Sequence, residues 1–392
     1  MEIKPSRRAQ GIKASPTLKI AAQAAERLRS GRQVLNLATG EPAFPAPPQV
    51  SAAAIAAIAA ERDTSTATST ALEAAIIAKF ERDNGLRFKP EHIAISGGSK
   101  HSLYTLMQAL LDDDDEVIIP APYWVSYPDM ARLAGAEPVI VRTKARQHFK
   151  MTPEQLRGAL GPRSRLLLLN NPCNPTGAVY APSELGALAA VLLDFPEVVI
   201  ASDDVYEHLS WAPQPLEHVL AVAPRLHERT VIVNGLSKAY SMPEWRIGYA
   251  AGPAGLIAAI KKIQSHSTSA PATVVQAAAV AALDSKRAGS AAHIATLRKQ
   301  HDFLIAELRL IGGVEVLPAQ GAFFLFPDMS AVIERFDSID DDIELASWLL
   351  DETGVATVPG SAFGATGCLR LSYTPALDIL REAVAKLRRV LG

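Results

Sequence analysis

The sequence predicts an α/β protein with a mostly parallel, seven-stranded-type sheet flanked by helices on both faces. Short apolar runs alternate with helical patterns, and polar residues follow several of the runs. The predicted strands cover residues 92–96, 116–120, 137–141, 165–170, 197–202, 230–234 and 246–252. Nearly continuous apolar strands that alternate with helices are typical of parallel sheets buried on both sides.

The predicted helices are identified by spacing and by composition. After the first strand, Leu103, Leu106, Met107 and Leu110 recur at helical intervals, which predicts a helix over residues 99–111. The alanine-rich stretches 51–60 and 276–283 are also predicted to be helical, because alanine has the highest helix propensity. The acidic run before the strand at 116–120 is predicted to be a turn without a chemical role.

The length and the composition limit the possible classes of protein. A chain of 392 residues predicts two or three domains, and a net charge of −2 gives no reason to expect nucleic acid or an anionic membrane surface as a partner. Two cysteines are too few for a disulfide framework and fit a reducing compartment. No apolar run has the length of a signal peptide or a membrane span. We therefore expect a cytoplasmic protein, without a metal site.

Polar residues follow several of the predicted strands, at the edge where ligands bind in parallel sheets. The first strand leads into Gly98, Ser99 and Lys100 where a helix opens, a place suited to a phosphate, although glycines there also shape ordinary turns. The strand 165–170 leads into "NPCNPTG", where Asn174 stands between prolines in what could be a simple turn. The strand 197–202 leads into Asp203, a residue type that also caps helices.

The stretch "NGLSKAYSMPEWR", residues 234–246, follows the next strand. A lone lysine in a loop is usually solvated and has no chemical role. The alternative makes Lys238 an imine-forming amine, with Ser237 and Arg246 holding an anionic group beside it.

Taken together, the strand-end residues meet the needs of one cofactor. That cofactor would have a phosphate, an aldehyde, a ring nitrogen kept protonated by a carboxylate, a ring oxygen and a flat aromatic ring. The residues predicted to meet these needs are, in the same order, the Gly98–Ser99–Lys100 turn with Ser237 and Arg246; Lys238; Asp203; Asn174 and Tyr206; and Trp124. This combination predicts pyridoxal 5'-phosphate.

The chain resembles the fold-type I aminotransferases, and most closely the bacterial branch of the aspartate aminotransferases. The resemblance covers nearly the whole chain and rests on ordered motifs. They are "LATGEPAF" (37–44), "PAPYWVSYP" (120–128), "NPCNPTG" (171–177), "SDDVYEHL" (202–209), "NGLSKAYSMPEWRIGY" (234–249), "QSHSTSAP" (264–271), "GAFFLF" (321–326) and "VPGSAFG…LRLSY" (358–373).

The resemblance implies a role for each site residue. Lys238 would bind the cofactor and move a proton between the substrate and the cofactor, while Asp203 pairs with the ring nitrogen. Tyr206 and Asn174 would hold the ring oxygen, and Trp124 would stack on the ring. Arg370 would bind the substrate α-carboxylate, helped by Asn174 and the backbone of Gly40. Lys100 would reach a distal carboxylate of the substrate.

The resemblance also implies the architecture and the activity. We expect a large cofactor domain over residues 45–285, a small domain built from residues 1–44 and 286–392, and a homodimer with shared active sites. The expected activity is a ping-pong transfer of an amino group from an L-amino acid, aspartate or glutamate, to a 2-oxo acid. The alternatives are a transaminase for aromatic or neutral amino acids, a β-lyase on the same cofactor, and a non-catalytic regulator that senses the cofactor.

The chain departs from the family pattern at three places. Asp204 stands where the family has glutamate, and Pro243 with Glu244 stand where it has Thr-Gly. In "DTSTATSTALE", the positions of a family tyrosine, glycine and arginine fall on Asp63, Thr68 and Glu73. In the family that tyrosine contacts the cofactor phosphate of the other subunit.

A carboxylate at position 63 would repel that phosphate. We therefore expect Asp63 to face solvent and a hydroxyl of Thr64, Ser65 or Thr66 to make the contact instead. The alternative is a polar loop that has lost the contact.

Overall fold

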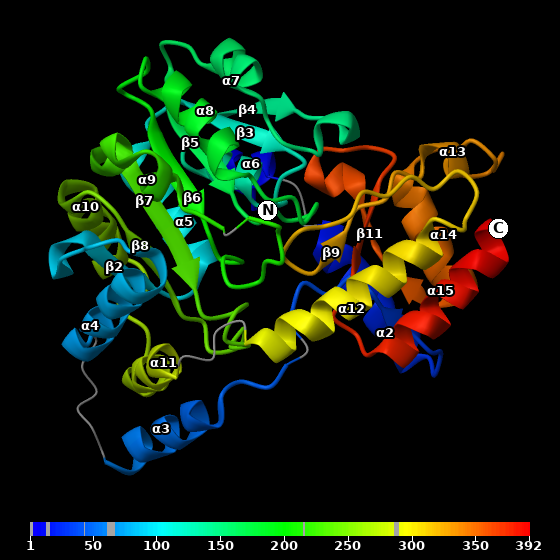
Figure 1. The fold of residues 1–392 in the computed structure, drawn as a ribbon, viewed down its shortest axis with the longest axis horizontal. Helices are drawn as coiled ribbons and strands as arrows, with labels where there is room; N and C mark the ends of the chain where they lie inside the picture. The colour runs from blue at the N-terminus through cyan, green and yellow to red at the C-terminus, as the bar shows by residue number, and fades with distance from the viewer. Residues whose placement is uncertain (1–2, 13–15, 43, 61–66, 215, 286–289) are drawn as a thin grey trace.

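The computed structural model describes residues 3–12, 16–42, 44–60, 67–214, 216–285 and 290–392. Its elements form two bodies that lie side by side (Figure 1). The larger body is built around a seven-stranded sheet, and the smaller one combines α2 and β1 from near the N-terminus with the elements that follow residue 290.

The seven-stranded sheet confirms the predicted fold class. The strand order is β2-β8-β7-β6-β5-β3-β4, and the neighbours from β7 to β4 are parallel. Strand β8 is antiparallel to both of its neighbours, a direction that the sequence did not predict. The strands are β2 (Ile93–Ser96), β3 (Glu116–Ala121), β4 (Glu137–Arg142), β5 (Ser164–Asn170), β6 (Val199–Asp203), β7 (Thr230–Gly235) and β8 (Gly248–Ala251).

Helices cover both faces of this sheet. Successive residues of a strand point to opposite faces, so each face has its own apolar side chains to bury. Leu166 and Leu168 of β5 pack in a core that includes side chains of α5, α6 and α10, whereas Leu167 and Leu169 pack with α4, α8, α9 and α11. The helices of the larger body are α3 (Pro48–Ala59), α4 (Thr70–Lys79), α5 (Ser99–Leu110), α6 (Tyr127–Leu133), α7 (Pro153–Ala159), α8 (Pro182–Leu192), α9 (Val219–Val222), α10 (Ala254–Ser265) and α11 (Thr273–Asp284).

The predicted helices and the predicted turn are all present. Helix α5 coincides with the predicted helix to within one residue, and α3 and α11, which contain the alanine-rich stretches, pack against each other. The acidic run forms a turn before β3, and Asp114 takes a positive φ of 72° there.

The smaller body has its own hydrophobic core. Strand β1 (Leu35–Asn36) pairs with β10 (Val355–Ala356), and a second sheet has the order β11-β12-β9. The remaining elements are α2 (Pro16–Arg29), α12 (Ala291–Leu308), β9 (Phe324–Leu325), α13 (Ser330–Ile333), α14 (Asp342–Thr353), β11 (Val358–Pro359), β12 (Leu369–Ser372) and α15 (Leu377–Leu391). The pairing of β1 with β10 brings the residues after β1 close to β12. The exact domain boundaries after residues 44 and 285 stay a prediction.

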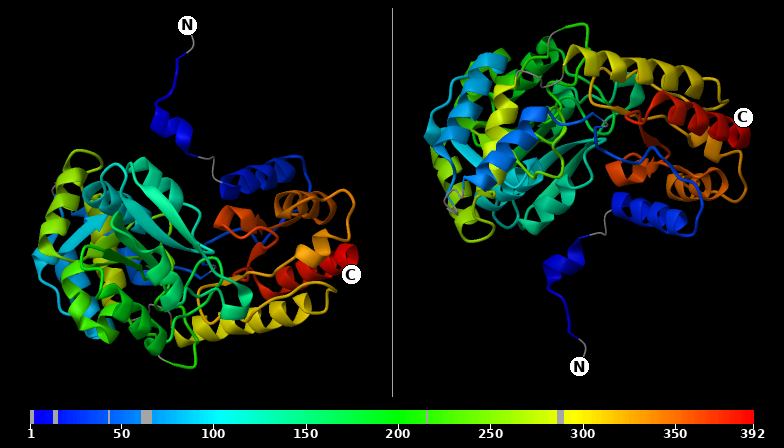
Figure 2. Two further views of the ribbon diagram at one scale, coloured as in Figure 1. Left: turned by 90° about the horizontal axis from the view of Figure 1, so that it is seen from above. Right: turned by 90° about the horizontal axis from the view of Figure 1, so that it is seen from below.

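The N-terminal segment with α1 (Arg7–Gly11) projects away from the two bodies (Figure 2). None of the residues of α1 is buried, although the helix passes near α6. Among the helices in the described part of the chain, none combines the length and the apolar character that a membrane crossing requires.

Candidate active site

A cavity of about 540 Å³ lies at the carboxyl ends of the parallel strands, where the smaller body meets the sheet. It gathers every predicted site residue except Gly98, which directly precedes the lining residue Ser99 in the chain. The predicted residues that line it are Gly40, Ser99, Lys100, Trp124, Asn174, Asp203, Tyr206, Ser237, Lys238, Arg246 and Arg370.

Strand register explains why residues far apart in the sequence meet here. Asn170 at the end of β5 stands opposite Asp203 at the end of β6, and Asp203 stands opposite Val233 near the end of β7. Lys238 follows β7 by a few residues. Because parallel strands end at one edge, their terminal side chains converge on one site.

Asp203 is 5% exposed, and a hydrogen bond reaches one of its two carboxylate oxygens. The hydroxyl of Tyr127 donates to Oδ2 at 2.6 Å, whereas Oδ1 has no hydrogen-bond partner among the described residues. Burial raises the pKa of Asp203 to about 6, and the Tyr127 hydrogen bond works against that rise. A buried, unpaired carboxylate oxygen fits the N–H of a protonated ring nitrogen.

The Lys238 amine donates to the backbone oxygen of Gly40 at 2.5 Å. Burial lowers the pKa of Lys238 to about 8; the charge of Glu41 opposes this shift, and Arg370 adds to it. A lysine with such a pKa has an appreciable neutral fraction near pH 7, and the neutral amine is the form that attacks an aldehyde.

The Arg370 guanidinium is buried in the same cavity. Nη1 donates to Oδ1 of Asn174 at 3.0 Å and Nη2 donates to the backbone oxygen of Ala38 at 2.8 Å, while Nε has no partner among the described residues. The rings of Phe324 and Phe363 lie 4.3 and 4.9 Å from its central carbon. Burial lowers the pKa of Arg370 to about 10. A fixed guanidinium suits two-point binding of a carboxylate.

Backbone and Arg246 form a cradle at the start of α5. Gly98 has a φ of 102°, a conformation that favours glycine, and a Cβ there would lie 2.5 Å from Nη2 of Arg246 and displace the guanidinium. Arg246 itself has a positive φ of 52°, and its Nη1 donates to the backbone oxygen of Pro243 at 2.9 Å. The first N–H groups of α5, the exposed guanidinium and Ser237 together suit a phosphate.

These features together fit pyridoxal phosphate. Tyr206 and Asn174 lie beside Asp203 in the lining, and Trp124 lies under the Lys100 ammonium, whose Nζ is 5.0 Å from the ring centroid. Burial raises the pKa of Tyr206, which keeps its hydroxyl protonated as a donor. The structure thus brings together the residues predicted for the ring, the aldehyde and the phosphate.

Two residues at this site were missed by the sequence analysis. Asn170 donates through Nδ2 to the backbone oxygen of Asp203 at 2.8 Å, and its Oδ1 accepts from the backbone N–H of Asn174 at 2.7 Å. Its position at a strand end was a usable signal. Tyr127 had a weaker signal, its place three residues after Trp124 at the start of a helix.

The residues that differ from the family pattern lie in different surroundings. Glu73, at the family arginine position, forms an ion pair with Lys261 at 3.4 Å. Asp204 lies 2.7 Å from the His218 imidazole. The predictions for Asp63, Thr64, Ser65 and Thr66 fall outside the described residues. In the described part of the chain, no group of three or more His, Cys, Asp or Glu side chains could hold a metal ion.

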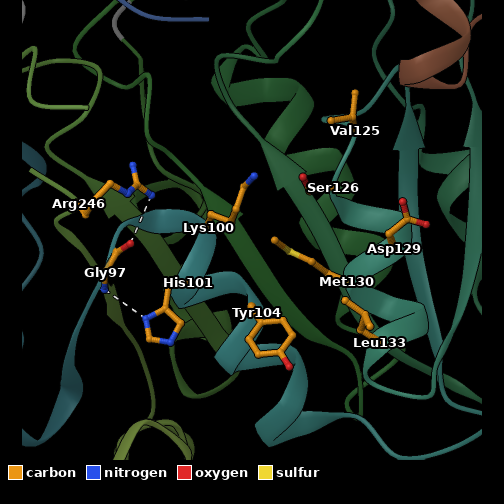
Figure 3. Close-up of a pocket in the computed structure, with 10 residues that line it drawn as sticks. All are labelled: Gly97, Lys100, His101, Tyr104, Val125, Ser126, Asp129, Met130, Leu133 and Arg246. Carbon is orange, nitrogen blue, oxygen red and sulfur yellow. Dashed lines mark hydrogen bonds between the residues drawn. The ribbon is translucent and has the colours of Figure 1, made fainter. Parts of the chain in front are cut away.

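A second hollow of about 410 Å³ adjoins the cavity and shares Lys100, Val125 and Arg246 with it. Figure 3 shows the side chains of Tyr104, Met130 and Leu133 together on one side of this hollow. Asp203 and Lys238 line the first cavity and not this hollow, so the chemistry belongs to the first cavity. We call the second hollow the side groove.

Comparison with known proteins gives consistent matches over the full chain. The family model "Aminotransferase class I and II" matches residues 32–387. The aspartate/prephenate aminotransferase of Nitrosomonas europaea is 42% identical over 397 residues, covering 100% of both chains.

Solved structures match equally well. The aspartate aminotransferase from Rhizobium meliloti has a TM-score of 0.94 and 37% identity, covering 99% of this chain and 98% of the other. The aspartate aminotransferase from Thermus thermophilus with maleate has a TM-score of 0.92 and 38% identity, with complete coverage of both chains.

Proposed function

The chain belongs to the class I and II aminotransferases, and from this membership we propose that its preferred amino donor is an acidic amino acid, aspartate or glutamate. The protein is a transaminase that depends on pyridoxal phosphate and moves an amino group from an L-amino acid to a 2-oxo acid. The proposal concerns which amino acid the site prefers and which residues do the work.

The observation that carries the proposal is that two cations are available for a dicarboxylate in one cavity. Four cationic side chains, Lys100, Lys238, Arg246 and Arg370, line the cavity together with two carboxylates. In our assignment Arg246 serves the phosphate and Lys238 the aldehyde. Arg370 then remains for the α-carboxylate and Lys100 for a distal carboxylate.

The relatives support a substrate with two carboxylates. The matched proteins are named aspartate or aspartate/prephenate aminotransferases, and the Thermus thermophilus structure contains maleate, a dicarboxylate. Partial burial lowers the pKa of Lys100, and the charge of Arg246 lowers it further. An ammonium that has lost part of its hydration gains more from a carboxylate partner than a fully hydrated one does.

In the proposed mechanism each residue has one task. Pyridoxal phosphate, when bound, supplies an aldehyde for the donor amine and a protonated ring that draws electrons from the substrate α-carbon. Arg370, fixed by Asn174 and Ala38, orients the substrate through its α-carboxylate. Lys238 holds and moves the proton at Nζ. Asp203 offers Oδ1 to the ring nitrogen.

A panel of half-reactions tests the choice of donor. The holoenzyme is mixed with aspartate, glutamate, alanine or phenylalanine, and the absorbance of the cofactor is followed through a single turnover. We expect the two acidic donors to react fastest at equal concentration. Faster reaction with phenylalanine or alanine would favour the aromatic or neutral transaminase, and elimination products without amino transfer would favour the β-lyase.

We also propose that the working form is a homodimer. The side groove places apolar side chains beside the active site, and Tyr104 there is 36% exposed. On α3, Ile55 and Ile58 are 66% and 64% exposed, which leaves an unpartnered apolar stripe. Light scattering coupled to gel filtration should give the mass of two chains. A monomer at micromolar concentration with full activity would contradict the proposal.

We place the protein in the cytoplasm. Cys173 and Cys368 are both free, as expected in a reducing compartment. Fractionation of cells that express the protein tests this, and recovery of the activity outside the cytoplasmic fraction would contradict it.

A further inference from the structure

Tyr127 contacts two of the residues proposed to hold the cofactor. Its hydroxyl donates to Oδ2 of Asp203 at 2.6 Å, and its ring meets the Trp124 indole edge to face, with centroids 5.3 Å apart. Tyr127 is 2% exposed, and its place at the start of α6 is fixed by the core around it. One side chain therefore connects the carboxylate proposed for the ring nitrogen with the aromatic platform proposed for the ring.

The proton in this contact belongs to Tyr127. Burial raises the pKa of the Tyr127 hydroxyl well above its usual value, and the neighbouring Asp203 charge raises it further. The phenol is therefore the donor and the carboxylate the acceptor. A hydrogen bond donated to a carboxylate stabilises its ionised form.

The contact also sets which oxygen of Asp203 is available. Oδ2 is taken by Tyr127, and Oδ1 is left without a partner among the described residues. A carboxylate held through one oxygen cannot rotate freely, so the free oxygen keeps one direction. Such preorganisation reduces the ordering that ligand binding would otherwise require.

We propose that Tyr127 is a positioning residue, which holds the Asp203 carboxylate ionised and oriented so that Oδ1 meets the ring nitrogen of pyridoxal phosphate. The inference rests on the proposed pairing of Asp203 with that nitrogen. Tyr127 acts through Asp203 and does not itself touch the reacting atoms.

The other groups that face Asp203 have to be considered in any pH experiment. Asp204 follows it on the chain and raises its pKa, whereas the backbone N–H of Val205 and the Lys238 amine lower it. Tyr206 and Cys173 lie in the loops beside it. All of these stay in place when the Tyr127 hydroxyl is removed. A difference in pH dependence between the wild type and a variant without this hydroxyl therefore reports on Tyr127 alone.

The matched pair of variants is Tyr127→Phe and Tyr180→Phe. Tyr180 is also a buried tyrosine of the larger body, but its hydroxyl accepts from the backbone N–H of Met151 and does not contact Asp203. Both changes remove one buried hydroxyl. A merely structural role for Tyr127 predicts similar behaviour of the two variants.

The measurement is the dissociation constant of pyridoxal phosphate from the apoenzyme across a range of pH. We expect Tyr127→Phe to weaken binding about tenfold at neutral pH, since a hydrogen bond to a charged group is lost. The acid-side midpoint, where protonation of Asp203 weakens binding, should move upward by about one pH unit. Tyr180→Phe should leave that midpoint unchanged.

A second substitution at the same position tests whether the pH midpoint can be shifted in the opposite direction. A fluorinated tyrosine at position 127 keeps the shape of the side chain and makes its hydroxyl a stronger donor. It should move the midpoint downward. An unchanged midpoint in both Tyr127 variants would overturn the inference.

A double variant separates failure of the inference from failure of the site assignment. In an Asp203→Asn background, Tyr127→Phe should cause no further loss of affinity. If Asp203→Asn alone leaves the affinity unchanged, the proposed pairing of Asp203 is wrong. If Asp203→Asn weakens binding but Tyr127→Phe does not, only the role of Tyr127 is wrong.

Discussion

Two groups of buried charges lie at the end of β6, and they are built in opposite ways. Asp203 belongs to the active site, together with Lys238 and Arg370. The next residue, Asp204, belongs to a second group with Lys79, Glu207 and His218, which we call the paired cluster. Neighbouring residues of an extended strand point to opposite sides. The side chains of Asp203 and Asp204 therefore belong to two separate groups.

In the paired cluster every charge has a partner of opposite sign. Lys79 contacts Glu207, and His218 lies 2.7 Å from Asp204 and 2.8 Å from Glu207 through its two nitrogens. Asn234 donates to Glu207 as well, at 2.6 Å. Burial alone would lower the pKa of His218, but the two carboxylates raise it to about 10. Burial would raise the pKa of Glu207, but Lys79 and His218 hold it well below its usual value.

In the active site the charges are left partly unpaired, and their pKa values shift toward the neutral form. Burial raises the pKa of Asp203 to about 6 and lowers those of Lys238 and Arg370 to about 8 and about 10. Asp203 Oδ1 and Arg370 Nε have neither a hydrogen bond nor an ion pair in the described structure. Asp204 Oδ2 and His218 Nδ1 also lack a well-aligned hydrogen bond, but they form an ion pair with each other at 2.7 Å. The difference indicates that the paired cluster serves stability, while the active-site charges await ligands of opposite charge.

The largest expected effect is on activity. Lys238→Ala should lower kcat by at least about 10³-fold, since the amine that holds the cofactor and moves the proton is lost. The apoprotein should remain folded. The Lys238 amine contacts the backbone oxygen of Gly40 and, among the described residues, forms no ion pair as close as that of Lys79. Steady-state kinetics and thermal unfolding check both statements. A variant with near wild-type turnover would show that Lys238 is not the reacting amine.

The next effect is on stability, in the paired cluster. Lys79→Met leaves the buried Glu207 without its closest cation and should lower the free energy of unfolding by about 3–5 kcal/mol. Lys79 is 0% exposed, so solvent cannot replace the lost charge. Urea denaturation of the apoprotein measures the change.

The control removes both partners. Lys79→Met combined with Glu207→Gln leaves no uncompensated charge between them and should recover most of the loss. If the double variant is no more stable than Lys79→Met alone, the pairing does not explain the stability.

A smaller effect is expected at Lys100. Lys100→Ala should slow the half-reactions of aspartate and glutamate about 10- to 150-fold, the value of a charge-assisted hydrogen bond of about 1.5–3 kcal/mol. Alanine and phenylalanine should change little, because they carry no distal carboxylate. Equal losses for all four donors would assign Lys100 to the cofactor and not to the substrate.

The smallest effect is a pH dependence of cofactor capture. The folded-state pKa of Lys238 is about 8, below the value of 10.5 for an exposed lysine. The neutral amine therefore becomes abundant as the pH rises toward 8. The rate at which the apoenzyme binds pyridoxal phosphate should rise up to about pH 8 and then level off. A rate that keeps rising to pH 10 would indicate an ordinary lysine.

The fold was largely predictable because the strands of the large sheet are buried on both faces. Such strands are continuous apolar runs, and each predicted strand is present with its ends shifted by at most two residues. The direction of β8 left no signal in its composition. The strands β1 and β9 have two residues each, too few for any periodicity.

The site residues were predictable where a charged or reactive side chain comes directly after an apolar strand. Asp203 and Lys238 follow apolar runs directly, and parallel strands bring their ends together. Arg370 was found through the family resemblance, because its partner Asn174 is 196 positions away in the sequence. The paired cluster was missed for the same reason: Lys79 and Glu207 are 128 positions apart, and neither stands out alone.

The central claim is that the active-site charges are kept for a ligand at a cost in stability, and Asp203→Asn tests it most directly. Because the pKa of Asp203 is raised from 3.8 to about 6, the folded state holds this proton more tightly than the unfolded state does. The cost of the carboxylate develops between about pH 4 and pH 6 and is fully present at pH 7.

The measurement is the free energy of unfolding of apo Asp203→Asn at pH 7, together with its affinity for pyridoxal phosphate. We predict that the apoprotein becomes more stable by about 1–3 kcal/mol while the cofactor binds more weakly. The gain should disappear near pH 4. An apoprotein that is destabilised at pH 7, with unchanged affinity for the cofactor, would contradict the account.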